Sequence, residues 1–304
     1  MDSNDSSSTL RSRLMPSLAI VRYELRTLLG SWLVRLWLAG GVLLTLLMIL
    51  TNWNQMQTAP LVAVLLFPYL VFPWFLVVMV LGVEPVSGAR VETLVDGILS
   101  RPVTRYEYLL ASWAARVLVV LAGYLVVMLP AIALVSFAHR PVADDSVTLY
   151  GLLAALGVVG LVLVFQVSLS FLFGTLLRRP LLAMVILVFL WYPANVILHT
   201  FALEEFSPIS LSQSLPTVLR QPWHATEALV QKTPDLELEA LARQTSQFLS
   251  VFGGPAAETP EHKPGFFEKN NYRDFSLLRV ILGYGVPSLA SVGLATLCFS
   301  LRDL

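Results

Sequence analysis

Charged residues are scarce in this chain of 304 residues: they make up 13% of it, whereas soluble domains carry about 25%. Hydrophobic residues make up 56%, and the mean hydropathy is +0.73. A soluble fold of this length needs more polar side chains to cover its surface. The composition therefore excludes an ordinary water-soluble domain and predicts a polytopic membrane protein.

Cysteine and lysine are rarer still. Cys298 is the only cysteine, which excludes an internal disulfide and a metal centre built on cysteine ligands. None of the three lysines, Lys232, Lys263 and Lys269, follows the glycine loop of a phosphate-binding Gly-Lys-Ser/Thr motif. The four histidines show no metal-ligand spacing. We therefore expect no catalytic residue, no metal site, no bound cofactor and no ATP hydrolysis in this chain.

Six apolar stretches are long enough to cross a membrane, which takes about 20 residues. They predict an all-α, polytopic integral membrane protein with six transmembrane helices. The polar stretch 1–15 is expected to be a disordered cytoplasmic tail. The approximate bounds of the six spans are 32–51, 61–83, 109–137, 149–177, 181–203 and 277–301.

Arginine is distributed unevenly around these spans, and basic residues in short loops mark the cytoplasmic side. If the spans alternate, twelve arginines share the side of the N-terminus, whereas the short loop between spans 3 and 4 carries only Arg140. We predict cytoplasmic termini in the plasma or inner membrane. The 20 basic and 20 acidic residues balance, which gives no indication of a nucleic-acid partner. The twelve are Arg11, Arg13, Arg22, Arg26, Arg35, Arg90, Arg101, Arg105, Arg116, Arg178, Arg179 and Arg302.

The stretch 204–274 separates the transmembrane region 16–203 from the last span, in 275–304, and is predicted to be extracytoplasmic. Its 71 residues exceed the length of about 60 within which loop charge guides orientation. Thr233-Pro234-Asp235 is typical of a helix start and Gly253-Gly254 of a helix end. We therefore expect a partly helical external segment.

The loop between spans 2 and 3, at 84–108, carries an amphipathic pattern. Its apolar residues recur at helical spacing and would form one stripe, with charged residues opposite. Pro102 ends this predicted helix because its ring disfavours helical geometry at Arg101. Such a helix is either a handle for a soluble partner or one that rests on the membrane surface. The stripe is Val91, Leu94, Val95, Ile98 and Leu99; Arg90, Glu92, Asp96 and Ser100 face away from it.

This loop resembles the first cytoplasmic loop of ABC-2 type permeases of ATP-binding-cassette (ABC) transporters. Thr93-Leu94, Pro102-Val103-Thr104-Arg105 and Leu109-Leu110 match, whereas Glu84, Glu92 and Ser112-Trp113 depart from the family pattern. The resemblance implies a coupling helix that contacts a separate ATPase (nucleotide-binding) subunit, which would bind ATP and Mg²⁺. The residues implied in this contact are Arg90, Glu92, Thr93, Asp96, Arg101, Pro102, Thr104 and Arg105.

A second amphipathic stretch, 16–30, precedes the first span. Such a helix would lie in the membrane interface. Alternatively, its arginines only anchor the first span on the cytoplasmic side. The resemblance implies an elbow helix close to the ATPase. Its apolar face is Leu18, Val21, Leu25, Leu28 and Leu29, with Arg22, Glu24 and Arg26 largely off that face.

Polar and helix-breaking residues within the spans are the remaining candidates. We expect Arg35 and Arg116, near cytoplasmic ends, to snorkel to water. Gln166 is expected to hydrogen-bond between helices rather than to bind substrate. Asn195 and His199 are other polar groups. Helix interruptions are predicted at Pro68, Pro73, Pro193, Gly283, Gly285 and Pro287, and close helix contacts at Gly157 and Gly160.

These features predict a permease subunit, with export as the family's commoner direction, that works with a second copy or a related permease in the lipid bilayer. One alternative is a stand-alone membrane enzyme or secondary transporter, which predicts acids or metal ligands converging at mid-membrane. Another is a membrane scaffold that recruits a partner through 204–274. The sequence leaves the substrate open.

Overall fold

The structure, a computed structural model, describes residues 5–83, 104–138, 140, 147–177, 179–200, 207–220 and 277–300, with most side chains from Ser17 onward. Every regular element within these residues is an α-helix, so the predicted all-α class is confirmed. The helices are α1 (Asp5–Gly30), α2 (Trp32–Asn52), α3 (Thr58–Leu70), α4 (Trp74–Val83), α6 (Arg105–Phe137), α7 (Leu149–Leu176), α8 (Pro180–Thr200), α9 (Pro208–Leu219) and α11 (Leu277–Ser300).

Five helical segments are long and apolar enough to cross a membrane: α2, α3 together with α4, α6, α7 and α11. They agree closely with five of the predicted spans, because each apolar run is contiguous and flanked by polar residues. The helix α8 has 21 residues, but its apolar part with described side chains, Pro180–Trp191, is shorter than a span. The sixth crossing therefore stays a prediction.

The predicted second span is divided into α3 and α4. Pro73 stands at the break, where its missing N–H and fixed ring interrupt helical hydrogen bonding. Helical geometry then resumes, with the Leu76 N–H donating to the Pro73 carbonyl at 3.2 Å. Pro68, Pro193 and Pro287 lie inside helices that continue past them. Among these prolines, only Pro73 lies between two helices, directly before the first residue of α4.

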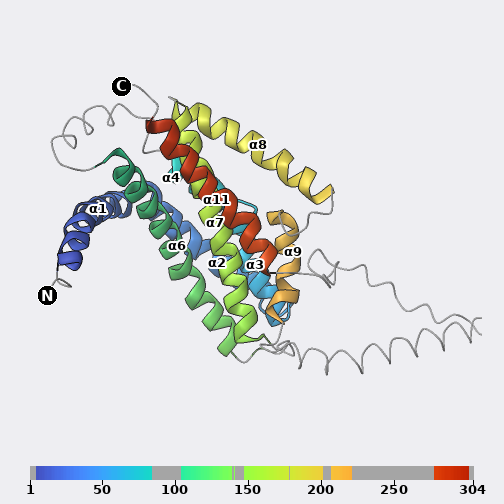
Figure 1. Ribbon diagram of the computed structural model, residues 1–304. Helices are drawn as coiled ribbons and strands as arrows, with labels where there is room; N and C mark the ends of the chain where they lie inside the picture. The colour runs from blue at the N-terminus through green and yellow to red at the C-terminus, as the bar shows by residue number, and fades with distance from the viewer. Residues whose placement is uncertain are drawn as a thin grey trace, which may run out of the picture.

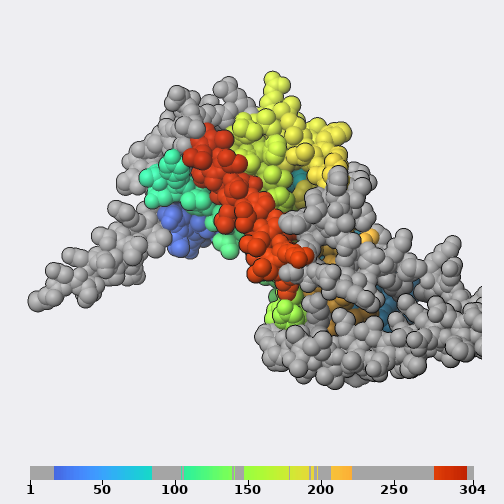
Figure 2. Space-filling view, turned by 45° about the vertical axis from the view of Figure 1, so that its right-hand side comes forward, coloured from blue at the N-terminus to red at the C-terminus, as the bar shows by residue number. Residues whose placement is uncertain are grey.

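The helix α7 lies at the centre of the bundle (Figure 1). It packs most extensively against α11, then against α4, and also against α6 and α9. Figure 2 shows α11 as a continuous band on the molecular surface. Most of its outward side chains are apolar, as expected for a helix that faces hydrocarbon, and the exposed Arg279 lies near its first turn. They include Leu278, Ile281, Leu282, Val286 and Leu289.

Two glycines permit the close packing of α4 on α7. A Cβ at Gly82 would lie 2.5 Å from Ser170 Cβ, and one at Gly174 would lie 2.7 Å from the Val83 carbonyl oxygen. The close contact expected at Gly157 is wrong, because a Cβ there would meet no described atom within 4 Å. Gly160 would meet a Leu121 methyl group at an ordinary 3.4 Å. The α4 end is thus held tightly against α7.

The helix α9 begins the stretch that we expected to be external, yet it packs against α3, α7 and α8. Pro208 starts it at a favourable first-turn position. Most of its side chains are buried, including Leu211, Leu215 and Leu219. At least this part of 204–274 belongs to the bundle. The helix expected after Thr233 lies outside the described residues.

The helix α1 lies beside the bundle and packs mainly against α6 (Figure 1). It begins at Asp5, so helical structure extends into the stretch 5–15 that we expected to be a disordered tail. The Ser- and Asp-rich sequence at this end suits a helix N-terminus, because such side chains accept hydrogen bonds from first-turn amides.

Candidate functional site

The candidate site is the end of the bundle where α4 ends and α6 begins, which we call the loop end. The chain between these helices, 84–103, holds most of the residues implied in ATPase contact. Six of them lie outside the described residues: Arg90, Glu92, Thr93, Asp96, Arg101 and Pro102. The structure therefore describes the end of α4 and the start of α6, which flank the predicted coupling helix, and not that helix itself.

Thr104 and Arg105 are the two implied contact residues that the structure places, at the start of α6. The Thr104 hydroxyl accepts a hydrogen bond from the Glu107 N–H at 3.3 Å, and the Glu107 carboxylate accepts one from the Thr104 N–H at 3.0 Å. This reciprocal pair is a capping box, which satisfies amides that a helix start leaves unpaired. Thr104 thus fixes the point at which the loop ends and α6 begins.

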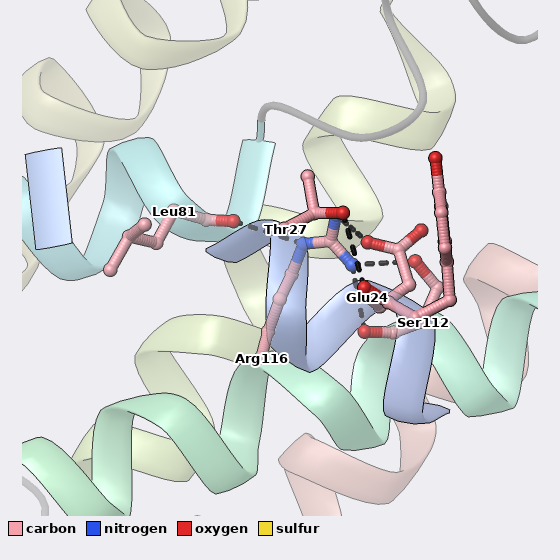
Figure 3. A network of polar contacts seen from close by, with 6 residues as sticks. Glu24, Thr27, Leu81, Ser112 and Arg116 are labelled. Carbon is pink, nitrogen blue, oxygen red and sulfur yellow. Dashed lines mark hydrogen bonds and ion pairs between the residues drawn. The ribbon is translucent and has the colours of Figure 1, made fainter. Parts of the chain in front are cut away.

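Arg116 lies about three turns further along α6 and forms a buried junction between three helices (Figure 3). It is 3% exposed, so the expectation that it snorkels to water is wrong. Its Nε donates to the Leu81 carbonyl of α4 at 3.0 Å, and its Nη1 donates to the Ser112 carbonyl at 2.7 Å and hydroxyl at 2.5 Å. Its Nη2 lies 3.8 Å from the Glu24 carboxylate of α1. We call Glu24, Leu81, Ser112 and Arg116 the Arg116 junction.

The Leu81 carbonyl is a suitable acceptor for a reason visible in the sequence. A helical carbonyl normally accepts from the N–H four residues later, and that residue here is Pro85, which has none. The guanidinium takes the place of this missing donor. Its positive charge also lies at the C-terminal end of α4, where the helix dipole favours a cation. Arg116 therefore stabilises the last turn of α4, directly before the loop.

Glu24 lies on the side of α1 that faces the bundle, with a side chain that is 14% exposed. We expected it to lie largely off the apolar face with Arg22 and Arg26, and those two arginines are indeed exposed. The amphipathic pattern of α1 alone could not show that Glu24 contacts a buried arginine of α6. Tyr108 also hydrogen-bonds to Glu24 through its side chain. The buried charge of Arg116 is thus balanced by a carboxylate from α1.

Ser112 and Trp113, where the sequence departs from the ABC-2 pattern, both take part in packing at the loop end. Ser112 accepts from Arg116, as described above. The Trp113 Nε1–H donates to the Ser168 hydroxyl of α7 at 3.1 Å. Ser168 in turn donates to the Val164 carbonyl at 2.7 Å. Ser112 is thus part of the Arg116 junction, and Trp113 connects α6 to α7.

The opposite end of the bundle holds a second buried arginine. Arg140, beyond the end of α6, donates to the Met56 carbonyl at 3.2 Å and to the Thr58 hydroxyl at 2.8 Å. Its guanidinium lies 5.6 Å from the centre of the Trp53 ring, a cation–π arrangement. Burial lowers the pKa of Arg140 from its ordinary value. No carboxylate lies within ion-pair distance of it among the residues that the structure describes.

Among the residues that the structure describes, Gln166 has no partner for the interhelical hydrogen bond that we expected. Its side chain is fully buried in α7, and neither its oxygen nor its nitrogen has a described partner. Trp37 likewise has a buried indole N–H without a described partner. The side chains of Asn195 and His199 lie outside the described set, whereas Arg35 is exposed as expected.

The loop end therefore combines one buried cation, one carboxylate and a helix-end carbonyl from three separate helices. Such an arrangement makes the positions of the three helices depend on one another. Within the described ranges, no three metal-ligating side chains gather at one place. Comparison with protein-family models, curated proteins and solved structures gives no match for this chain.

Proposed function

We propose that this chain is the membrane-spanning permease subunit of an ABC-2 type transporter, acting with a separate ATPase subunit that binds ATP and Mg²⁺. A second copy or a related permease would complete the pathway, and export is the proposed direction. In this proposal six spans cross the plasma or inner membrane, with both termini in the cytoplasm. The twelve arginines that share one side of the alternating spans support that orientation.

One observation carries the proposal: the segment that resembles a coupling loop lies between the last turn of α4, which Arg116 binds, and the start of α6, the helix that carries Arg116. The loop starts just after the α4 turn whose Leu81 carbonyl accepts from Arg116, and it ends at the capped start of α6. The amphipathic helix α1, the proposed elbow helix, reaches the same arginine through Glu24. A soluble subunit docked on the loop would thus act on α1, α4 and α6 together.

The energy for such action comes from nucleotide binding at the ATPase. ATP shifts the permease between conformations only to the extent that the ATPase binds nucleotide more tightly in one of them. This requires mechanical contact between the loop and the spans. A displacement that the loop passes to the last turn of α4 would then reach α6 through the buried hydrogen bonds of Arg116.

Purification of the tagged chain from detergent-solubilised membranes tests the proposal. We expect an ATP-hydrolysing subunit to co-purify with the wild-type chain. The double charge reversal Arg101→Glu with Arg105→Glu should remove it, because these residues lie in the loop. The matched control reverses Arg178 and Arg179, which lie between α7 and α8 on the same proposed side, and should retain the ATPase.

Two results would overturn the proposal. One is a wild-type chain that never retains an ATPase; the other is a loop variant that retains both the ATPase and transport activity. Transport or group transfer that needs no nucleotide would instead favour a secondary transporter or membrane enzyme. Loss of a bound partner on deletion of 221–276, with the loop intact, would favour a scaffold.

A further inference from the structure

The last turn of α4 is held from two sides. On one side, Gly82 and Gly174 bring its backbone against α7 so closely that a Cβ at Gly174 would lie 2.7 Å from the Val83 carbonyl oxygen. On the other side, Arg116 binds the Leu81 carbonyl at 3.0 Å. The α7 contact is steric and does not depend on charge. The Arg116 contact depends on a buried cation, and therefore on what neutralises it.

A carboxylate that neutralises Arg116 comes from a different helix. Glu24 belongs to α1, which packs beside the bundle, and its carboxylate lies 3.8 Å from Arg116 Nη2. This is longer than the 2.5–3.0 Å of the hydrogen bonds that hold Arg116 to Ser112 and Leu81. The contact with α1 is thus an ion pair, whereas the contact with α4 is a hydrogen bond.

We propose that Arg116 is a positioning residue that couples α1 to the last turn of α4. When Glu24 is in place, the guanidinium is neutralised and can stay buried on the Leu81 carbonyl. When α1 moves away, the guanidinium loses this carboxylate, which makes its burial less favourable and weakens its bond to that carbonyl. The coupling is reciprocal: whatever displaces the α4 end also weakens the docking of α1.

This inference deepens the proposed function, on which its biological role rests. The loop follows directly after the last turn of α4, so an ATPase that displaces the loop would alter the Leu81 contact. Through Arg116, the same displacement would loosen or tighten α1. The elbow and the coupling loop would then respond as one unit rather than as two independent contacts of the ATPase.

Hydrogen exchange on the chain alone, in lipid nanodiscs, tests the coupling without any partner. Glu24→Gln removes the charge on α1 and touches no α4 atom. We expect amide exchange in the last turn of α4, around Leu81 and Val83, to accelerate at least threefold. Arg26→Gln, on the exposed side of the same helix, is the matched control and should leave α4 exchange unchanged.

Glu24→Asp and Arg116→Lys keep the test decisive if Glu24→Gln folds poorly. Glu24→Asp retains the carboxylate and should restore most of the α4 protection. Arg116→Lys keeps the charge but loses the forked donor that reaches α1 and α4 together, and should accelerate exchange in both helices. The proposal is overturned if these changes affect exchange in α1 only, because a simple packing contact would do no more.

A second measurement addresses the role in coupling. In the complex with a co-purified ATPase, Glu24→Gln should retain the ATPase but lose at least half of the permease-dependent change in its ATP turnover. Unaltered turnover per bound ATPase would contradict that role. If the wild-type chain retains no ATPase, the proposed function fails, whereas the exchange experiment still decides whether Arg116 couples the two helices.

Discussion

Arg116, about three turns into α6, and Arg140, just beyond the C-terminal end of that helix, are both buried, and they differ in the groups that bind them. Arg116 has a carboxylate from α1, a carbonyl from α4 and two acceptors on Ser112. Arg140 binds a carbonyl, a hydroxyl and an aromatic face, all within the short stretch 53–58. Arg116 connects α1, α4 and α6, which are far apart in sequence. Arg140 binds only the connection between α2 and α3 among the described residues.

The difference indicates at which end of the bundle one helix depends on the position of others. A cation balanced by a carboxylate on another helix makes two helices depend on each other, because separation leaves both charges unpaired. A cation held by neutral acceptors loses only hydrogen bonds, which water can replace. At the loop end, displacement of one helix therefore weakens its contacts with the others. At the other end, Arg140 stabilises the connection between α2 and α3.

The largest effect is expected from Arg116→Met. It leaves Glu24 as an unpaired buried charge and the Leu81 carbonyl without its donor, so the free energy of unfolding should fall by about 3–5 kcal/mol. Thermal or denaturant unfolding in detergent, followed by circular dichroism, measures this. Arg35→Met, at an exposed arginine of α2, is the control and should change stability by less than about 0.5 kcal/mol. A loss at Arg116 no larger than the control would refute the buried junction.

Arg140→Met should cost less, up to about 3 kcal/mol, because the Met56 carbonyl and Thr58 hydroxyl left behind are neutral. The same unfolding measurement applies. Thr58→Val, which removes only the hydroxyl acceptor, should produce part of the loss. Equal losses for Arg140→Met and Arg116→Met would mean that Arg140 also faces a carboxylate, and the contrast between the two ends would disappear.

The helical architecture was largely predictable from the sequence, and the junction was not. Apolar runs mark the spans because a membrane helix must be apolar along a contiguous stretch. Burial of Arg116 depends on Glu24 and on the Leu81 carbonyl, which are distant in sequence, so its position near a span end suggested snorkelling instead. The absence of an N–H at Pro85, four residues after Leu81, was the one sequence signal that pointed to an external donor.

The short helix α9 and the glycine contacts escaped prediction for different reasons. Pro208 and the spacing of Leu211, Leu215 and Leu219 did indicate a helix, but twelve residues are too few for a span and the surrounding stretch is polar. Glycine spacing within α7 suggested Gly157, whereas packing uses Gly174. Which face of a helix meets a neighbour is decided by the whole bundle, and a one-helix pattern cannot specify it.

Gly174→Ala sharpens the comparison by forcing α4 away from α7 at the loop end. The added Cβ would lie 2.7 Å from the Val83 carbonyl oxygen and 3.0 Å from its Cα, and backbone cannot yield as a flexible side chain can. We expect a loss of about 2 kcal/mol and faster amide exchange in the last turn of α4. Gly157→Ala, in open space on the same helix, should be neutral or stabilising by up to about 1 kcal/mol. Similar losses for both variants would show that α4 and α7 are not tightly packed.

The smallest effect is expected at Thr104, where the capping box separates a structural role from an ATPase contact. Thr104→Ala removes the hydroxyl that accepts from the Glu107 N–H and should cost about 1 kcal/mol, whereas Thr104→Ser keeps the cap and most of the stability. Exchange should rise in the first turn of α6 and not around Arg140, because a lost cap frays only the nearest turn. If Thr104→Ser keeps the fold but loses a co-purified ATPase, the methyl group of Thr104 contacts the partner. If both variants lose the ATPase only in proportion to stability, Thr104 serves the loop end solely by starting α6.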